Sequence, residues 1–154
     1  MTYDKFISES LAGGLIQEQE SSTSAAEKLL KRSAKDLLAS KANLKIDEGI
    51  AYTVAYLAML RAGRSFMLLR GFRPSNGYQH KTVVQFVSEA LGKEHAEMIE
   101  RFDRMRRKRN TFTYEIDITI SHTEAVEALH TAEEFVRLII GIVRKENPQG
   151  NFKF

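Results

Sequence analysis

The chain has 154 residues, with 23 Lys+Arg against 20 Asp+Glu, a formal net charge of +3, and neither cysteine nor tryptophan. The length suits one domain whose core needs no metal or disulfide, and the lack of cysteine excludes disulfide scaffolds, iron–sulfur clusters and thiol nucleophiles. No apolar run approaches the roughly 20 residues of a membrane span, and the N-terminus lacks the pattern of a signal peptide. We therefore expect a soluble, cytoplasmic protein with one domain, residues 1–146, and a C-terminal tail, residues 147–154.

Apolar residues recur at steps of three and four along the first half of the chain, which predicts helices. The first helix is expected over residues 3–19, although a Gly-Gly pair inside it weakens the prediction. A second helix starts near Ser24, with Glu27 in the capping-box position. A third, over residues 50–71, is apolar on most of its circumference and is expected to form the buried centre of a bundle. Residues 71–77, GFRPSNG, give the strongest loop signal.

The second half of the chain continues the helical pattern. Three further helices are expected: residues 81–91, residues 94–108, and a segment that follows a cap at Ser121 or Thr123 and ends near Lys145. Residues 110–120, NTFTYEIDITI, are β-branched and aromatic, but no partner strand is evident. Because an isolated strand leaves its backbone unsatisfied, we interpret them as an extended connection. The sequence thus predicts an all-α, up-and-down bundle of five to six helices.

The net charge of +3 hides two basic segments. Residues 101–109 hold six cations and one acid, a net charge of +5, and residues 49–88 hold five cations and no acid, also +5. The remainder of the chain must therefore carry −7. Charge segregated in this way favours an anionic partner, and the two basic segments are candidates for one shared surface.

Several kinds of active site are excluded by their motifs. The sequence has no Gly-x-Ser-x-Gly elbow and no phosphate-cradling glycine loop. Glu127 and His130 have the Glu-x-x-His spacing of di-iron bundles, but such centres need two of these motifs and two further glutamates. We expect this pair to be solvated, and His80 to cap or pack beside its helix rather than bind a metal. No metal or cofactor is therefore predicted.

The densest charge lies near the end of the fifth predicted helix. It consists of five cations in six positions, Arg104, Arg106, Arg107, Lys108 and Arg109. One interpretation is a solvated helix end, where each cation gains about 0.3–1 kcal/mol from the helix dipole. The other is an anion-binding segment, which the mutual repulsion of so many neighbouring cations favours.

Two arginines of the third predicted helix, Arg61 and Arg64, lie one turn apart and need polar surroundings. They are expected either to reach solvent or to pair with acids of the fifth helix, namely Glu94, Glu97 or Glu100. The alternative is functional: the two arginines extend the basic surface around Arg106, Arg107 and Arg109.

The order of these features resembles the HEPN superfamily of small α-helical proteins. A long apolar helix, a loop, a histidine before another helix (HKTVVQFVSEALG), a basic helix ending in Arg-Asn and a last amphipathic helix follow one another over roughly residues 24–146. The signature of that family is Arg, a polar residue, three more residues and then His. This chain is similar, with Arg109 and Asn110, but has Tyr114 where the family has histidine.

The resemblance implies a homodimer in which two motifs meet at a cleft and cleave RNA without a metal, as in toxin or defence ribonucleases. The RNA 2′-OH attacks its own phosphate while an arginine offsets the charge that develops. Arg109 is then the phosphate stabiliser, Asn110 an orienting group and Tyr114 a weak proton donor, because a phenol stays protonated at pH 7.

Other members of the resembling family are non-catalytic and partner small nucleotidyltransferases. In that branch the partner modifies a tyrosine two residues beyond the histidine. The corresponding position here is Ile116, so Tyr114 is the remaining candidate acceptor. Two alternatives to RNA cleavage thus stay open: a non-catalytic binding module, and a structural homodimer whose basic helix is solvated.

Overall fold

The computed structural model describes residues 1–75, 79–115 and 117–148. This part of the chain forms six α-helices, one 3-10 turn and two short strands. In order they are α1 (Tyr3–Ala12), β1 (Ile16–Glu18), α2 (Thr23–Asn43), α3 (Glu48–Leu69), β2 (Phe72–Pro74), α4 (Gln79–Leu91), η1 (Lys93–His95), α5 (Ala96–Tyr114) and α6 (His122–Glu146). The predicted all-α bundle is confirmed.

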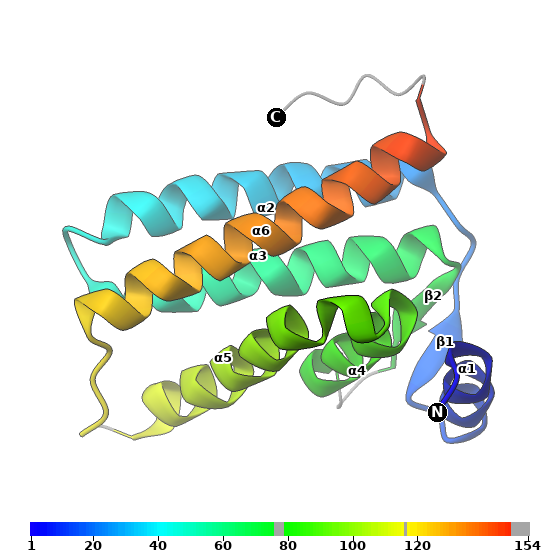
Figure 1. Ribbon diagram of the computed structural model, residues 1–154, viewed down its shortest axis with the longest axis horizontal. Coiled ribbons are helices and arrows are strands. Elements are labelled where there is room, and N and C mark those ends of the chain that lie inside the picture. Colours follow the sequence, from blue (N-terminus) through cyan, green and yellow to red (C-terminus); the bar gives the residue numbers. More distant parts are fainter. Residues whose placement is uncertain (76–78, 116, 149–154) are drawn as a thin grey trace.

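Helix α3 is the centre of the bundle. It packs against α2 and α6 on one side and against α4 and α5 on the other (Figure 1). Thirteen of its residues are buried, around most of its circumference, as its apolar sequence predicts. Its N-terminus is capped by Asp47, whose carboxylate accepts a hydrogen bond from Ile50 N at 3.1 Å. Because α4 and α5 both pack on α3, residues of α3 can contribute to a site on either helix.

The N-terminal helix is shorter than predicted. α1 ends at Ala12, and the chain then turns at Gly14. The φ of Gly14 is +72°, a backbone angle that glycine adopts with little strain. β1 then pairs antiparallel with β2, with Ile16 opposite Pro74. A helix was predicted to residue 19, but residues 16–18 form β1. A loop was predicted over residues 71–77, but residues 72–74 form β2, and residues 76 and 77 are outside the described residues. Three-residue strands are too short for alternation to reveal them.

Helices α2 and α4 begin earlier than their sequence signals suggest. The N-cap of α2 is Ser22, whose hydroxyl accepts a hydrogen bond from Ala25 N at 3.1 Å, so the predicted capping box at Ser24 is wrong. α4 already starts at Gln79. It ends before Gly92, as predicted, where φ is +76°.

The end of α5 departs most from the sequence prediction. Residues 110–114 continue the helix to Tyr114 rather than forming an extended connection. The hydroxyls of Thr111 and Thr113 donate hydrogen bonds to carbonyls four residues back, at 3.1 and 2.8 Å, which accommodates β-branched residues in a helix. Phe112 packs so closely on α3 that a Cβ at Gly49 would lie 2.3 Å from its Cζ. Tertiary packing has overridden local preference here.

Helix α6 agrees with its prediction. Ser121 is the N-cap and forms a complete capping box with Glu124, with Glu124 N donating to Ser121 Oγ at 3.1 Å. The helix ends at Glu146, one residue beyond the predicted end. Asn147 then donates a hydrogen bond to Glu27 at 3.1 Å, and residues 149–154 of the predicted tail are outside the described residues.

Two aromatic groups fill the interior. The ring of Phe86 on α4 has four aromatic neighbours with centroids 5.8–6.3 Å away: Tyr3, Phe6, Phe66 and Phe72. The second group, Tyr56, Phe102 and Phe135, joins α3, α5 and α6. Across the described helices, none is both long enough and apolar enough to span a membrane.

Candidate functional site

The basic segment of α5 is largely neutralised by acids. Five of its six cations have a carboxylate partner: Arg101–Glu97 (2.7 Å), Arg104–Glu100 (3.8 Å), Arg106–Asp103 (2.8 Å), Arg107–Asp103 (3.4 Å) and Lys108–Glu124 (3.3 Å). Most of these acids lie three or four residues earlier on the same helix, where side chains are neighbours. The repulsion inferred from the sequence is therefore offset, and charge density by itself does not require a bound anion.

Arg109 is the exception in this segment. Within the described part of the chain it has no carboxylate partner, and its Nη1 donates only a long hydrogen bond of 3.4 Å to Asn110 Oδ1. Its Nε is buried and has no hydrogen-bond partner among the described residues. A guanidinium with unused donors and no counter-charge is the group that an incoming oxyanion stabilises most.

Of the other two motif residues, Asn110 contacts Arg109, but Tyr114 does not converge with it in one protomer. Asn110 is exposed, and the Tyr114 side chain is 82% exposed at the end of α5. Residues five apart on a helix point in directions about 140° apart, so Tyr114 cannot share the inward direction of Arg109. Ile116, the position corresponding to the family's modified tyrosine, is outside the described residues.

His80 lies at the start of α4 and is held by α3. Its Nδ1 and the Tyr56 hydroxyl are 2.9 Å apart, and the two rings lie with centroids 5.7 Å apart. Tyr56 is fully buried, and this burial raises the pKa of its phenol above the usual value, so the phenol remains neutral. The sequence analysis expected His80 to cap or pack beside the helix that follows it; the structure places His80 within the first turn of α4, with Tyr56 of α3 as its partner.

Three arginines surround this imidazole. Burial lowers the pKa of His80, and the charges of Arg109, Arg64 and Arg106 lower it further. Arg109 and Arg106 come from α5, whereas Arg64 comes from α3, so three helices meet at His80. We call Tyr56, Arg64, His80, Arg106 and Arg109 the His80 cluster.

The two arginines of α3 have different environments. Arg61 pairs with Asp36 of α2, a carboxylate that is only 3% exposed, rather than with any of the acids predicted on α5. Arg64 donates a hydrogen bond to Gln79, its Nε is buried without a partner, and burial lowers its pKa. Of the two, only Arg64 therefore belongs with the basic residues of α5.

No sequence pattern predicted Tyr56 as part of a site, and His80 was predicted only to cap or pack beside its helix. The one available signal was a lone histidine directly after a loop, followed by an amphipathic helix. Tyr56 lies within an apolar run, where nothing in the pattern separates it from core residues. Their association depends on how α4 docks on α3, which local sequence patterns do not specify.

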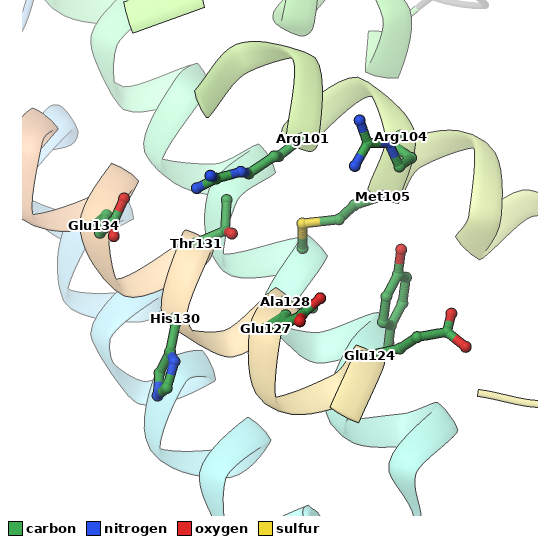
Figure 2. Close-up of a pocket in the computed structure, with 10 residues that line it drawn as sticks. Arg101, Arg104, Met105, Glu124, Glu127, Ala128, His130, Thr131 and Glu134 are labelled. Carbon is green, nitrogen blue, oxygen red and sulfur yellow. The ribbon is translucent and has the colours of Figure 1, made fainter. Parts of the chain in front are cut away.

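A second feature is a groove of about 410 Å³ between α5 and α6. Figure 2 shows Arg101 and Arg104 on its α5 side and three glutamates, Glu124, Glu127 and Glu134, on its α6 side. Tyr52 also lines it; burial and the nearby Glu124 raise the pKa of this phenol to about 12. With both signs of charge on its walls, the groove does not favour an anion.

Glu127 and His130, the Glu-x-x-His pair, both lie on the exposed face of α6 beside this groove. The ring of His130 points away from Arg101 and Arg104 (Figure 2). Within residues 1–75, 79–115 and 117–148, no three His, Asp or Glu side chains are grouped so that they could hold a metal ion. The exposure of both side chains agrees with a solvated pair.

Comparison with protein families agrees with this architecture. The model of the HEPN domain matches residues 26–144, from the first turn of α2 to the last turn of α6. The chain therefore belongs to the HEPN family. A search of curated proteins gave no significant match.

Proposed function

We propose that this protein binds RNA through the phosphate backbone, as a HEPN domain of the toxin or defence type, with Arg109 as its principal phosphate contact. The observation that carries the proposal is the Arg109 guanidinium, which occupies the motif position and has unused donors. The neighbouring cations Arg104, Arg107 and Lys108 are paired but exposed or half-exposed, so RNA can compete for them. Such surface pairs contribute only about 0–1 kcal/mol and are readily exchanged.

RNA cleavage is the chemical extension of this proposal. The 2′-hydroxyl of one ribose loses its proton to water as its oxygen attacks the adjacent phosphorus, the bond from phosphorus to the 5′-oxygen breaks, and the leaving oxygen takes up a proton. Arg109 stabilises the charge on the phosphate, and Asn110 orients it. Because Tyr114 points away from Arg109, a second protomer has to place its own Tyr114 near the phosphate. The proposal therefore includes a homodimer.

The test uses labelled single-stranded RNA with excess EDTA, at several salt concentrations. We expect binding that weakens steeply as salt rises, since phosphate contacts release counterions, and cleavage slow enough to require long incubation. Arg109→Ala should abolish both, whereas Arg104→Ala, which changes an exposed cation paired with Glu100, should lose only part of the binding. RNA binding without cleavage would leave a binding module, and no binding at low salt would reject the proposal in favour of a structural homodimer.

A second candidate function is supported by the exposure of Tyr114. A hydroxyl on a side chain that is 82% exposed at a helix end is accessible to a modifying enzyme. The protein would then be the partner and substrate of a small nucleotidyltransferase in a toxin–antitoxin pair. A neighbouring gene for such an enzyme, and a nucleotide-sized mass increase on the chain that Tyr114→Phe abolishes, would establish it.

We also infer that residues 1–146 act as one domain. The support is that α1 shares the aromatic core of the bundle: the rings of Tyr3 and Phe6 both contact Phe86 of α4. Limited proteolysis should leave residues 1–146 intact; rapid removal of α1 by the protease would contradict a single domain.

A further inference from the structure

His80 differs from the other three histidines of the chain. His122 is largely exposed and lies 3.7 Å from Glu48, His130 is exposed, and His95 lies in the 3-10 turn η1. His80 alone among them has its Nδ1 bound to a buried phenol, the hydroxyl of Tyr56, at 2.9 Å. Because Nδ1 is occupied, Nε2 is the ring nitrogen available to a ligand.

The groups that face His80 are nearly all cationic. α3 contributes Tyr56, a neutral phenol, and Arg64; α5 contributes Arg106 and Arg109. The acid nearest to this set is Asp103, and it is already paired with Arg106 at 2.8 Å. Within the described part of the chain, Arg64 and Arg109 have no carboxylate partner. Two positive charges without a carboxylate partner therefore act, together with burial, to lower the pKa of this imidazole.

The same two arginines have buried donors without partners. Arg64 Nε and Arg109 Nε are both inaccessible to solvent and unpaired among the described residues. A buried donor left unsatisfied costs about 1–3 kcal/mol. Folded proteins retain few such groups, and an ion that binds there is one recognised explanation. Both arginine side chains are nevertheless partly exposed, so an oxyanion can reach the guanidinium groups elsewhere and supply the missing negative charge.

We propose that Arg64, His80 and Arg109 bind one phosphate group of the RNA backbone within a single protomer, and that His80 binds it in the protonated form. The inference rests on the proposed function, because Arg109 serves both, but it places the phosphate at the junction of α3, α4 and α5. Arg64 and Arg109 donate to two phosphate oxygens, and His80 Nε2 donates to a third. The proton that His80 gains comes from solvent, so binding is coupled to proton uptake.

The consequence is that affinity depends on pH. An anion next to Arg64 and Arg109 offsets the positive charge that, in addition to burial, lowers the pKa of His80, so the bound state has the higher pKa. By linkage, each unit by which the anion raises the pKa of His80 corresponds to about tenfold tighter binding to the protonated form. Binding must then strengthen as pH falls from 8 to 5.

The experiment follows the four histidines of the ¹⁵N-labelled full chain in two-bond ¹H–¹⁵N spectra between pH 5 and 8.5. The probe is sulfate, whose charge is constant over this range, at an ionic strength held constant with sodium chloride. We expect sulfate to raise the pKa of His80 and to leave His95, His122 and His130 unchanged. Inorganic phosphate and a five-nucleotide RNA serve as two further arms, which separate a free anion from a backbone phosphate.

Matched variants complete the design. Arg109→Ala and the milder Arg64→Gln should abolish the effect of sulfate on His80, whereas Arg104→Ala should preserve it. His80→Gln keeps a neutral donor, so it should bind RNA with an affinity that no longer rises at low pH. Spectra of each variant show whether it is folded. If Arg109→Ala does not fold, Arg64→Gln alone tests whether the effect of sulfate on His80 depends on these arginines.

The outcomes separate the two proposals. If sulfate, phosphate and RNA all leave the pKa of His80 unchanged while RNA still binds through Arg109, the inference is wrong and the proposed function stands. If sulfate raises the pKa of His80 but RNA does not bind at low salt, the phosphate site exists and the proposed function is wrong. A response that survives both Arg64→Gln and Arg109→Ala would also overturn the inference.

Discussion

The hydroxyl of Tyr56 and the Nδ1 of His80 form a hydrogen bond of 2.9 Å between the central helix of the bundle and the start of α4. Tyr56 is fully buried against Phe102, so its position is fixed by the core. His80 is thereby held between the core and the arginines of α5. The same bond links packing to the electrostatics of the His80 cluster.

Tyr56→Phe removes this bond with little change in volume. It leaves His80 Nδ1 without its partner, and we expect a loss of about 1 kcal/mol in the free energy of unfolding. Urea unfolding measures the loss, and Tyr114→Phe is the control, because its exposed hydroxyl should change stability by less than about 0.5 kcal/mol. Equal effects of the two substitutions would show that the Tyr56–His80 bond contributes nothing.

Gly49→Ala tests what holds the motif end of α5 in a helix. The added Cβ would lie 2.3 Å from Cζ of Phe112, and such overpacking costs about 1–3 kcal/mol. Gly141→Ala on α6 is the matched control: its Cβ meets no atom within 4 Å, so it should stabilise by about 0.5–1 kcal/mol. If Phe112→Leu does not relieve the loss in Gly49→Ala, the close contact is not its cause.

How far the sequence determines this fold is clearest from α3 and α5. The apolar circumference of α3 predicts its central place, because that prediction needs only composition and period. The end of α5 was not predictable in the same way: Thr111, Phe112 and Thr113 favour extended backbone locally, and they are helical because Phe112 packs on Gly49. Contacts distant in sequence decide such segments.

The candidate site likewise contains residues that local sequence predicts and residues that depend on distant contacts. Arg109 follows from charge density and motif order, both of which lie in one stretch of chain. The role of Arg64 and of His80 depends on the docking of α4 and α5 against α3, so the sequence could offer only alternatives for Arg64 and a packing role for His80. The pairing of Arg61 with Asp36 likewise joins residues 25 positions apart, with no spacing rule to indicate it.

Asp36→Asn removes the charge that compensates Arg61. The carboxylate is 3% exposed and also lies 3.5 Å from Arg32 Nε. Because Arg61 retains some contact with solvent, we expect a loss of about 3 kcal/mol in the free energy of unfolding, the low end for a broken buried pair. Glu9→Gln, which breaks an exposed pair with Lys5, should cost less than about 1 kcal/mol. A similar loss in both variants would mean that burial of Asp36 is unimportant.

Acid should weaken the start of α6 through Glu124. Burial acts to raise the pKa of Glu124, but hydrogen bonds from Lys108 and the Ser121 backbone outweigh it and hold the pKa below its usual value. A carboxyl whose pKa is lower in the folded chain stabilises the fold at pH values above its pKa in the unfolded chain. This stabilisation is lost as the pH falls through the pKa of the folded chain. Thermal unfolding between pH 7 and 3 should therefore depend less on pH in Glu124→Gln than in wild type. Glu127→Gln, an exposed neighbour, should retain the wild-type slope; a slope that Glu124→Gln leaves unchanged would contradict the role of Glu124.

His80 should also make the free energy of unfolding depend on pH, at pH values higher than those at which Glu124 has its effect. Its folded pKa lies below the ordinary value of 6.5, so between these two values the unfolded chain binds a proton that the folded chain does not. Stability therefore falls as pH decreases through about 6.5. Urea unfolding at pH 7.5, 6.5 and 5.5 should show this fall in wild type and a smaller one in His80→Gln, while His130→Gln should match wild type. Sulfate, by raising the folded pKa of His80, should reduce the fall in wild type alone. A fall of equal size in wild type and His80→Gln would mean that burial and the three arginines together do not lower the pKa of this imidazole.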